Sequence, residues 1–356
     1  METTVKQAKN ILGKILEFRI TGGNPPPVML WGAPGIGKSD IVKSIALERG
    51  LELQDIRLAQ LDPVDLRGVP TVENGQTRWA APSCFPQDKD SAGIIFLDEL
   101  SAADPSIQVA AYQLLLDRRI GDYVVPEKWM IVAAGNRAED NAVSLPISSA
   151  LANRMMHLEL KVDPEGWLRW ATSNGIAPEI CGFIRFRPQV LFVLPENCER
   201  GWASPRSWEN VSKILALNLD NAELASCVAG LIGENAAAQF LTYRKQFQML
   251  GNIREMMLNE TDVPELSSNK MDVYYAVASA IAYWVSQGCN DHETSLLLNG
   301  FFRISMTLPA TFAVVAMLDV METDKTEIVD ALVAHPDFEN WSKRFGNEME
   351  KMRRNE

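Results

Sequence analysis

The sequence predicts an α/β fold in which a parallel sheet carries a phosphate-binding loop, followed by a helical region. Residues Gly32–Ser39 read G-A-P-G-I-G-K-S and match the pattern G-x-x-x-x-G-K-[ST] at every fixed position. Residues Gly93–Glu99 form an apolar run without alternation that ends in two acids, as in a strand buried on both faces of a parallel sheet. From Asp163 onward the apolar residues recur at helical spacing.

The first elements place the loop in its expected context. Residues 1–20 carry apolar side chains on one face of a helix and predict an amphipathic helix. Residues Val28–Trp31 predict a short buried strand, and Ile41, Val42 and Ile45 follow the loop at helical spacing. A strand, a loop and a helix in this order are the context that the phosphate-binding motif requires.

The chemistry of a triphosphate explains the composition of the loop. Backbone N–H groups at a helix start surround the phosphates with partial positive charge, and glycines allow this close approach. Lys38 supplies an ammonium group for the β- and γ-phosphates, and Ser39 supplies a hydroxyl for Mg²⁺. The predicted nucleotide-binding residues are Gly32, Ala33, Pro34, Gly35, Ile36, Gly37, Lys38, Ser39, Asp40 and Asp98.

Two adjacent acids end the second strong strand signal. Open α/β sheets bind ligands at the carboxyl ends of their strands, which is where Asp98 and Glu99 lie. Asp98 is suited to hold Mg²⁺ together with Ser39, and Glu99 to orient and polarise an attacking water. Adjacent acids carry little information alone, but downstream of a phosphate-binding loop they predict a hydrolytic site.

A polar residue follows a further buried strand. Residues Trp129–Ala134 predict this strand, and Asn136 comes two residues after it. An asparagine there can hydrogen-bond the attacking water or the γ-phosphate. The alternative, an asparagine that only forms a turn, is equally common when judged without context.

The last predicted strand begins next to an arginine. Residues Leu51–Leu58 and Met155–Leu160 predict two more strands, and Arg154 directly precedes the second of them. A guanidinium group at the rim of the sheet can reach the nucleotide of a neighbouring subunit. Most surface arginines have no such role, so position alone does not justify the assignment.

Two turns predict β-hairpins. Asn74-Gly75 and Gly121-Asp122 are dipeptides that tolerate positive φ at the centre of a two-residue hairpin loop. For the first hairpin, a functional role and a surface position without function are equally compatible with the sequence.

The remainder of the chain predicts helices. Ser204 and Pro205 read as the N-cap and first turn of a helix, with Arg206 able to point at a phosphate or to be an ordinary exposed arginine. The predicted domains are a nucleotide-binding core over 1–161, a helical lid over 162–258 and a helical extension over 259–356, with a polar linker near 260–270.

Composition limits the functional classes. The chain has 356 residues and a net charge of −12, which disfavours a broad electrostatic surface for nucleic acid. Five scattered cysteines predict reduced thiols in a cytoplasmic protein. At the N-terminus, early charges and the absence of a long apolar run argue against a signal peptide. The most apolar long stretch, Val273–Val285, is too short for a membrane span and predicts a buried helix.

Together these motifs resemble those of the AAA+ ATPases. The similar positions are the Walker A, Walker B, sensor 1 and arginine-finger motifs, at Gly32–Ser39, Ile94–Glu99, Asn136 and Arg154. The two predicted hairpins fall where one AAA+ clade has its helix-2 insert and pre-sensor-1 hairpin. Ser204-Pro205-Arg206 resembles the sensor 2 motif of the MoxR branch of that clade.

This resemblance implies a P-loop αβα sandwich with a five-stranded parallel sheet, followed by an all-α lid. It implies ATP and Mg²⁺ as ligands, hexameric rings with nucleotide at subunit interfaces, and catalytic roles for Lys38, Glu99, Asn136, Arg154 and Arg206. Arg137 competes with Arg154 for the arginine-finger role, and action of Arg206 in cis or in trans stays open.

The resemblance also implies a remodelling or chaperone-like motor, often beside a partner with a von Willebrand factor A domain. This chain has no D-x-S-x-S run, so the metal-dependent adhesion site of such a domain would belong to the partner. A nucleic-acid motor, a metal-chelatase motor subunit and a non-hydrolysing nucleotide-gated scaffold remain alternatives.

Overall fold

In the computed structural model the chain divides into two compact units, Met1–Asp163 and Pro164–Glu356. The structure describes residues 2–140, 144–196, 199–263, 271–288, 290–323 and 325–355. Residues 264–270 of the predicted linker, together with Cys198 and Cys289, lie outside the described residues. The predicted division of the helical part into a lid over 162–258 and an extension over 259–356 stays a prediction.

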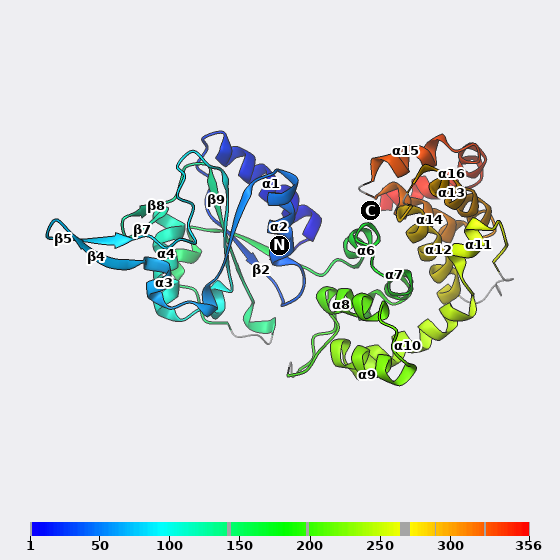
Figure 1. Ribbon diagram of the computed structural model, residues 1–356, viewed down its shortest axis with the longest axis horizontal. Coiled ribbons are helices and arrows are strands. Elements are labelled where there is room, and N and C mark those ends of the chain that lie inside the picture. Colours follow the sequence, from blue (N-terminus) through cyan, green and yellow to red (C-terminus); the bar gives the residue numbers. More distant parts are fainter. Residues whose placement is uncertain are drawn as a thin grey trace. The chain divides into compact units, whose positions relative to one another are not determined.

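The first unit is built on a parallel sheet (Figure 1). Its strands are β1 (Glu2–Thr3), β2 (Val28–Trp31), β3 (Glu52–Arg57), β6 (Gly93–Asp98), β9 (Trp129–Gly135) and β10 (Met156–Leu160). They lie in the order β1-β10-β2-β9-β6-β3, and every neighbouring pair is parallel. The α/β class and all five strands predicted from the sequence are therefore present.

The N-terminus differs from its prediction, because a sixth strand replaces the first residues of the expected helix. Glu2 and Thr3 pair with Glu159 and Leu160 of β10. Thr4 then caps the helix, since its side chain accepts a hydrogen bond from the N–H of Gln7 and the Gln7 side chain accepts one from the N–H of Thr4. Such a capping box fixes the helix start, so the helix begins at Val5 rather than at residue 1.

Helices cover both faces of the sheet. They are α1 (Val5–Ile20), α2 (Lys38–Glu48), α3 (Pro63–Arg67), α4 (Pro105–Asp117) and α5 (Ser149–Ala152). Helices α1 and α2 lie on one side and α3 and α4 on the other (Figure 1). On β6, Ile95 and Leu97 join the core cluster that includes Leu114 of α4, while Ile94 and Phe96, which alternate with them, are also fully buried. Burial on both faces accounts for the unbroken apolar run of this strand.

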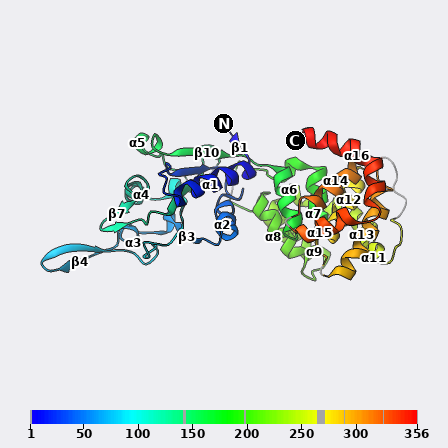
Figure 2. The same ribbon diagram turned by 90° about the horizontal axis from the view of Figure 1, so that it is seen from above.

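Two hairpins leave the sheet. The first is β4 (Val69–Glu73) with β5 (Gln76–Ala80), and the second is β7 (Arg119–Ile120) with β8 (Tyr123–Val124). The first hairpin projects from its unit in both views (Figures 1 and 2). Apart from half-buried Thr71, all residues of its two strands are exposed, and Val72 is 78% exposed. A hairpin without a core of its own is a protruding element and not part of the packed domain.

The described residues of the second unit form helices joined by turns. These are α6 (Pro164–Ser173), α7 (Pro178–Phe186), α8 (Pro205–Leu215), α9 (Asn221–Ile232), α10 (Glu234–Met249), α11 (Ile253–Leu258), α12 (Met271–Ser286), α13 (Asp291–Ser305), α14 (Ala310–Met321), α15 (Thr326–Ala334) and α16 (Phe338–Asn355). Helix α12 contains the long apolar stretch of the sequence and is mostly buried. Among the described residues, every helix is too short or too polar to cross a membrane.

Helices from both sides of the predicted lid boundary pack together. Helix α12 lies against α7, and a Cβ at Gly182 of α7 would come within 3.2 Å of the Cα of Ala276. The guanidinium group of Arg185 on α7 also pairs with Asp319 of α14. The two predicted regions thus share one packed interior in this unit.

Candidate active site

The phosphate-binding loop joins β2 to α2, and its glycines allow its shape. Gly35 and Gly37 have φ values of 79° and 101°, in the region that favours glycine. A Cβ at Gly32 would lie 2.4 Å from Cδ1 of Ile36 and 3.2 Å from the carbonyl oxygen of Leu160. The loop therefore turns tightly and leads directly into the N-terminus of α2, where N–H groups favour an anion.

Lys38 reaches back across the loop. Lys38 is only 8% exposed. The ammonium group donates hydrogen bonds to the carbonyl oxygens of Gly32 and Ala33, the latter at 3.1 Å, and to Oδ1 of Asn136 at 2.8 Å. The structure thus brings together two predicted site residues that are 98 positions apart.

Ser39 and Asp98 meet beside the loop. The Ser39 hydroxyl donates a hydrogen bond of 2.8 Å to Oδ2 of Asp98, which ends strand β6. The other oxygen of this carboxylate accepts a hydrogen bond from the N–H of Glu99 at 2.9 Å. A hydroxyl and a carboxylate oxygen in contact fit Mg²⁺, which prefers oxygen ligands and usually takes only one or two of them from the protein. No cluster of three or more His, Cys, Asp or Glu residues suited to a metal occurs in the described part of the chain.

Glu99 has an unusual backbone. Its φ of 59° and ψ of 31° lie in the left-handed region, which costs a non-glycine residue roughly 1–2 kcal/mol. The carbonyl oxygen of Glu99 accepts hydrogen bonds from the N–H groups of Ala102 and Ala103, which hold the turn. Within the described residues its half-buried carboxylate has no hydrogen bond or ion pair, so it is available to accept a proton or a hydrogen bond from water.

Ser101 is a site residue that the sequence analysis did not identify. It is fully buried, and its hydroxyl oxygen accepts a hydrogen bond from the N–H of Asn136 at 2.9 Å. The same hydroxyl contacts the carbonyl oxygen of Asn136 at 3.2 Å, and Ser144 donates to that carbonyl at 2.9 Å. These contacts fix the backbone from which the Asn136 side chain reaches Lys38. A serine two residues after paired acids was the available signal, but its partner lies 35 residues away.

The two candidate finger arginines differ in their surroundings. Arg137 donates hydrogen bonds to Asp140 at 2.9 and 3.2 Å and pairs with Glu139 at 3.1 Å. The hydrogen bond with Asp140 raises the pKa of Arg137. Arg154, between α5 and β10, is exposed and makes no side-chain ion pair or hydrogen bond within the described residues. Arg137 is therefore occupied within its own loop, whereas Arg154 is available to a partner.

A second feature missed from the sequence links the loop to the region of Arg154. Trp31, directly before the loop, donates a hydrogen bond from Nε1 to Nδ1 of His157 at 2.8 Å. The Nε2 atom of His157 lies 2.8 Å from the carbonyl oxygen of Ala152 in α5. Because Nδ1 accepts, Nε2 must carry the proton and donate to this carbonyl. One imidazole therefore connects strand β2 to the helix that precedes Arg154.

Arg206 lies in the second unit. Ser204 caps α8 in a capping box with Ser207, as the predicted helix start requires. Arg206 is exposed in the first turn of this helix. Its predicted action on a phosphate stays a prediction.

Comparison with known proteins supports the interpretation of the first unit. Residues 27–155 match the family model of the AAA domain, dynein-related subfamily. This range contains the loop, both acids, Asn136 and Arg154. The AAA-domain match implies nucleotide binding in this region.

The curated relatives include midasin from Giardia intestinalis, which is 34% identical over 180 residues. That alignment covers 48% of this chain and 4% of midasin, so the chain spans a small part of that relative's length.

The comparison with solved structures finds the RuvB Holliday junction branch migration motor of Thermotoga maritima and a putative ATPase from Cytophaga hutchinsonii. The first is 16% identical, with a TM-score of 0.38 and coverage of 71% of this chain and 73% of RuvB. The second is 14% identical, with a TM-score of 0.35 and coverage of 91% and 80%.

Proposed function

We propose that this protein is an ATP-hydrolysing AAA+ motor of the MoxR type that assembles into a ring and remodels a partner protein. The observation that carries the proposal is the convergence of two side-chain pairs at one edge of the sheet. Lys38 contacts Asn136, and Ser39 contacts Asp98, which Glu99 directly follows in the chain. A phosphate loop alone binds nucleotide, whereas this combination also supplies groups for hydrolysis.

Each side chain has a distinct task in this proposal. Lys38 and the loop N–H groups stabilise the negative charge that develops on the transferred phosphoryl group. Ser39 and Asp98 would hold Mg²⁺, and the ion would supply positive charge to the bound phosphates. Glu99 orients the attacking water and accepts its hydrogen bond. The amide oxygen of Asn136 accepts a hydrogen bond from Lys38 at 2.8 Å, and its NH2 group would donate to the γ-phosphate or to the water.

The proposed ring places a further positive charge at each site. Arg154 is the preferred candidate because it is exposed and Arg137 is held by Asp140 and Glu139. An arginine supplied by the next subunit would complete the site only after assembly, so turnover would depend on oligomerisation. A hexamer is the ring size that the family resemblance implies.

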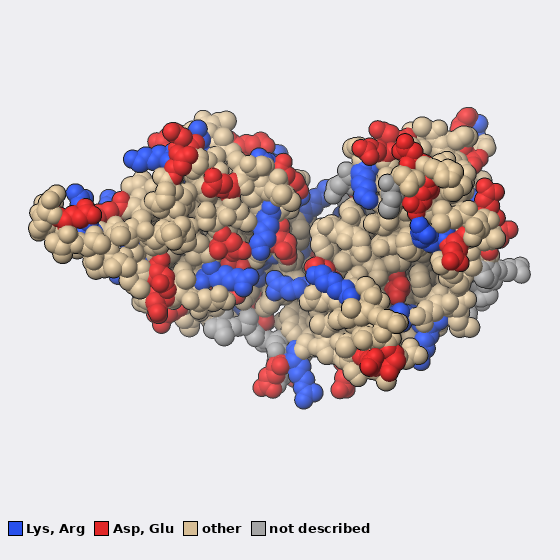
Figure 3. All heavy atoms as spheres, in the orientation of Figure 1, with Lys and Arg blue, Asp and Glu red and all other residues tan. Residues whose placement is uncertain are grey.

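The proposed partner is a protein that contains a von Willebrand factor A domain. The exposed hairpin β4–β5 supports an interaction with a protein, since Val69, Val72 and Trp79 place apolar surface on a protruding element. On the face drawn in Figure 3, acidic and basic side chains are both spread over each unit. With the net charge of −12, this favours a protein client over a nucleic acid.

The first experiment measures ATP hydrolysis against protein concentration, with mass photometry on the same samples. For the wild type we expect specific activity to rise as rings form. For Glu99→Gln we expect loss of turnover by about 100-fold or more, because the water is no longer activated, with ATP-bound rings retained. Glu327→Gln, the same change on an exposed position of α15, is the matched control and should behave as wild type.

Three results would contradict the proposal. Flat specific activity from a protein that stays monomeric would remove the shared-site mechanism and the role of Arg154. Turnover by Glu99→Gln at the wild-type rate would remove Glu99 from the chemistry. If ATP binds and assembled wild-type rings do not hydrolyse it, the protein is a nucleotide-gated scaffold.

A further inference from the structure

A pocket of the first unit lies at the opposite ends of the strands that carry the active site. It is lined by the loop that precedes β2, by the amino-terminal end of β9 and by the carboxyl-terminal ends of α1 and α4, and its volume is about 270 Å³. The nucleotide loop and Asn136 follow the carboxyl ends of the same two strands. The pocket is therefore separate from the proposed ATP site.

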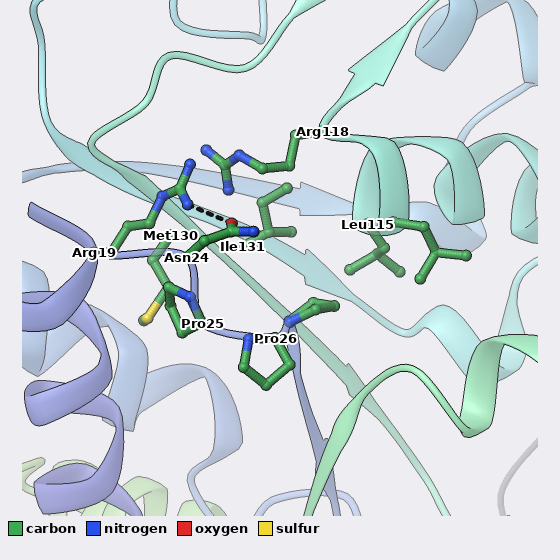
Figure 4. Close-up of a pocket in the computed structure, with 10 residues that line it drawn as sticks. Arg19, Asn24, Pro25, Pro26, Leu115, Arg118, Met130 and Ile131 are labelled. Atoms are coloured by element: carbon green, nitrogen blue, oxygen red, sulfur yellow. Dashed lines mark hydrogen bonds between the residues drawn. The ribbon is translucent and has the colours of Figure 1, made fainter. Parts of the chain in front are cut away.

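Arg19, Arg118 and Asn24 provide the polar side chains of this pocket. Arg19 and Arg118 both extend into it, and the remaining walls are mainly apolar, with Pro25–Pro27, Leu115 and Ile131 among them (Figure 4). Among the described residues, those that line the pocket include no acid. A pocket with two cations and no anion differs from an ordinary ion-paired surface.

Arg19 is buried and only partly satisfied. It is 8% exposed, and its Nη1 atom donates to the carbonyl oxygen of Gly23 at 3.1 Å and to Oδ1 of Asn24 at 2.8 Å. Its buried Nε atom has no hydrogen-bond partner among the described residues. Burial lowers the pKa of Arg19. The Nε–H group of this guanidinium is therefore available to a ligand, and a buried donor without a hydrogen bond lowers the stability of the fold.

Arg118, at the end of α4, is also held by hydrogen bonds to backbone carbonyl groups. Its Nη2 atom donates to the carbonyl oxygens of Pro126 and Trp129, at 2.9 and 2.7 Å. Burial, and then the charge of Arg19, lower the pKa of Arg118 to about 10. The charge of Glu127, which is exposed, acts in the opposite direction on the pKa of both arginines but does not outweigh burial. Two half-desolvated like charges thus face one cavity without a carboxylate in its walls.

We propose that this pocket binds a small organic carboxylate, whose carboxylate group pairs with Arg19 and Arg118 while its short apolar stem contacts the proline and leucine walls. Guanidinium groups match carboxylates through charge-assisted hydrogen bonds. The volume is below the usual range of about 300–1,000 Å³ for pockets that hold drug-sized ligands, so the ligand is small. The apolar walls favour a carboxylate with a hydrocarbon stem over a fully hydrated inorganic anion.

Alternatively, the two arginines have only a structural role, in which their hydrogen bonds hold the backbone carbonyl groups of the neighbouring loops in place. Asn24→Asp separates the two explanations, because it keeps the shape and the hydrogen bond to Arg19 while supplying a built-in carboxylate. The control is Asn10→Asp, which makes the same charge change on an exposed position of α1. The experiment titrates the full-length protein with sodium pentanoate and with inorganic phosphate at constant ionic strength, followed by ligand-observed NMR and thermal denaturation.

We expect saturable pentanoate binding to the wild type and to Asn10→Asp. Asn24→Asp should bind pentanoate at least about tenfold more weakly, and should have a higher melting temperature without ligand, because its own carboxylate replaces the ligand's. The absence of saturable pentanoate binding to the wild type would overturn the proposal. So would equal affinity in the two variants, or saturable binding of phosphate alone. These measurements contain no nucleotide, so their outcome is independent of the proposed ATPase activity.

Discussion

At the residue scale, the active site depends on buried polar contacts that hold the reacting side chains in place. Lys38 and Asn136 are recognisable from the sequence because each lies within or after a strong pattern. Ser101 and His157 are not, because their roles come from partners that are 35 and 126 residues away. A single sequence contains no information on which distant backbone a serine hydroxyl meets. The reacting groups could therefore be predicted, but not the residues that position them.

Ser101→Ala tests this positioning role. The substitution leaves the N–H of Asn136 without its partner in a buried place, which should lower the free energy of unfolding by about 1–3 kcal/mol. We expect a lower kcat with nearly unchanged affinity for nucleotide, because Asn136 would be misplaced while the loop stays intact. Urea denaturation and steady-state ATPase kinetics measure the two effects.

Ser144→Ala is the matched control for this prediction. It removes one hydrogen bond to the Asn136 carbonyl oxygen and keeps those of Ser101, so we expect a smaller loss in both measurements. If both variants lose the same amount of stability and the same fraction of kcat, Ser101 does not position Asn136 more than Ser144 does.

At the element scale, the strands and hairpins were predictable where local pattern and tertiary environment agree. The run Gly93–Asp98 is apolar because β6 is buried on both faces, and Asn74 adopts the φ of 52° that its hairpin turn demands. Strand β1 was not predictable, because two residues are too few to show an alternation of apolar and polar side chains. Its pairing with β10 also joins residues more than 150 positions apart. Short elements that exist only through distant pairing are therefore the ones that a single sequence hides.

A contact between the two hairpins leads to a prediction about their motion. Oδ2 of Asp122, in the β7–β8 turn, accepts a hydrogen bond from the N–H of Trp79 on β5 at 2.9 Å. A Cβ at Gly121 would also lie 3.1 Å from Cβ of Trp79, so the hairpins touch. Asp122→Ala removes the bond, and we expect hydrogen exchange in residues 69–80 to become about tenfold faster.

Hydrogen-exchange mass spectrometry of the isolated protein measures this change. Asp122→Asn keeps an acceptor oxygen at the same place and should have a much smaller effect. If Asp122→Ala leaves the exchange of β4 and β5 unchanged, the hairpins are independent elements and do not move as one.

At the scale of the whole molecule, the proposal requires that each active site be shared between two subunits. Arg154→Ala and Glu99→Gln should each abolish turnover in pure rings, for different reasons: the first lacks the donated arginine and the second lacks the activated water. In a mixed ring, a subunit with an intact Glu99 can lie next to one with an intact Arg154. Such an interface contains every required group.

We therefore expect mixing of the two inactive variants to restore about a quarter of the wild-type rate when subunits assemble at random in equal amounts. The measurement is ATP hydrolysis across a series of mixing ratios, with mass photometry to confirm mixed rings. Arg137→Ala mixed with Glu99→Gln is the comparison, because the ion pairs of Arg137 with Glu139 and Asp140 give it a structural role within its own loop. Mixed rings of Arg154→Ala that stay inactive would mean that this arginine acts within its own subunit, and recovery with Arg137→Ala alone would transfer the shared role to Arg137.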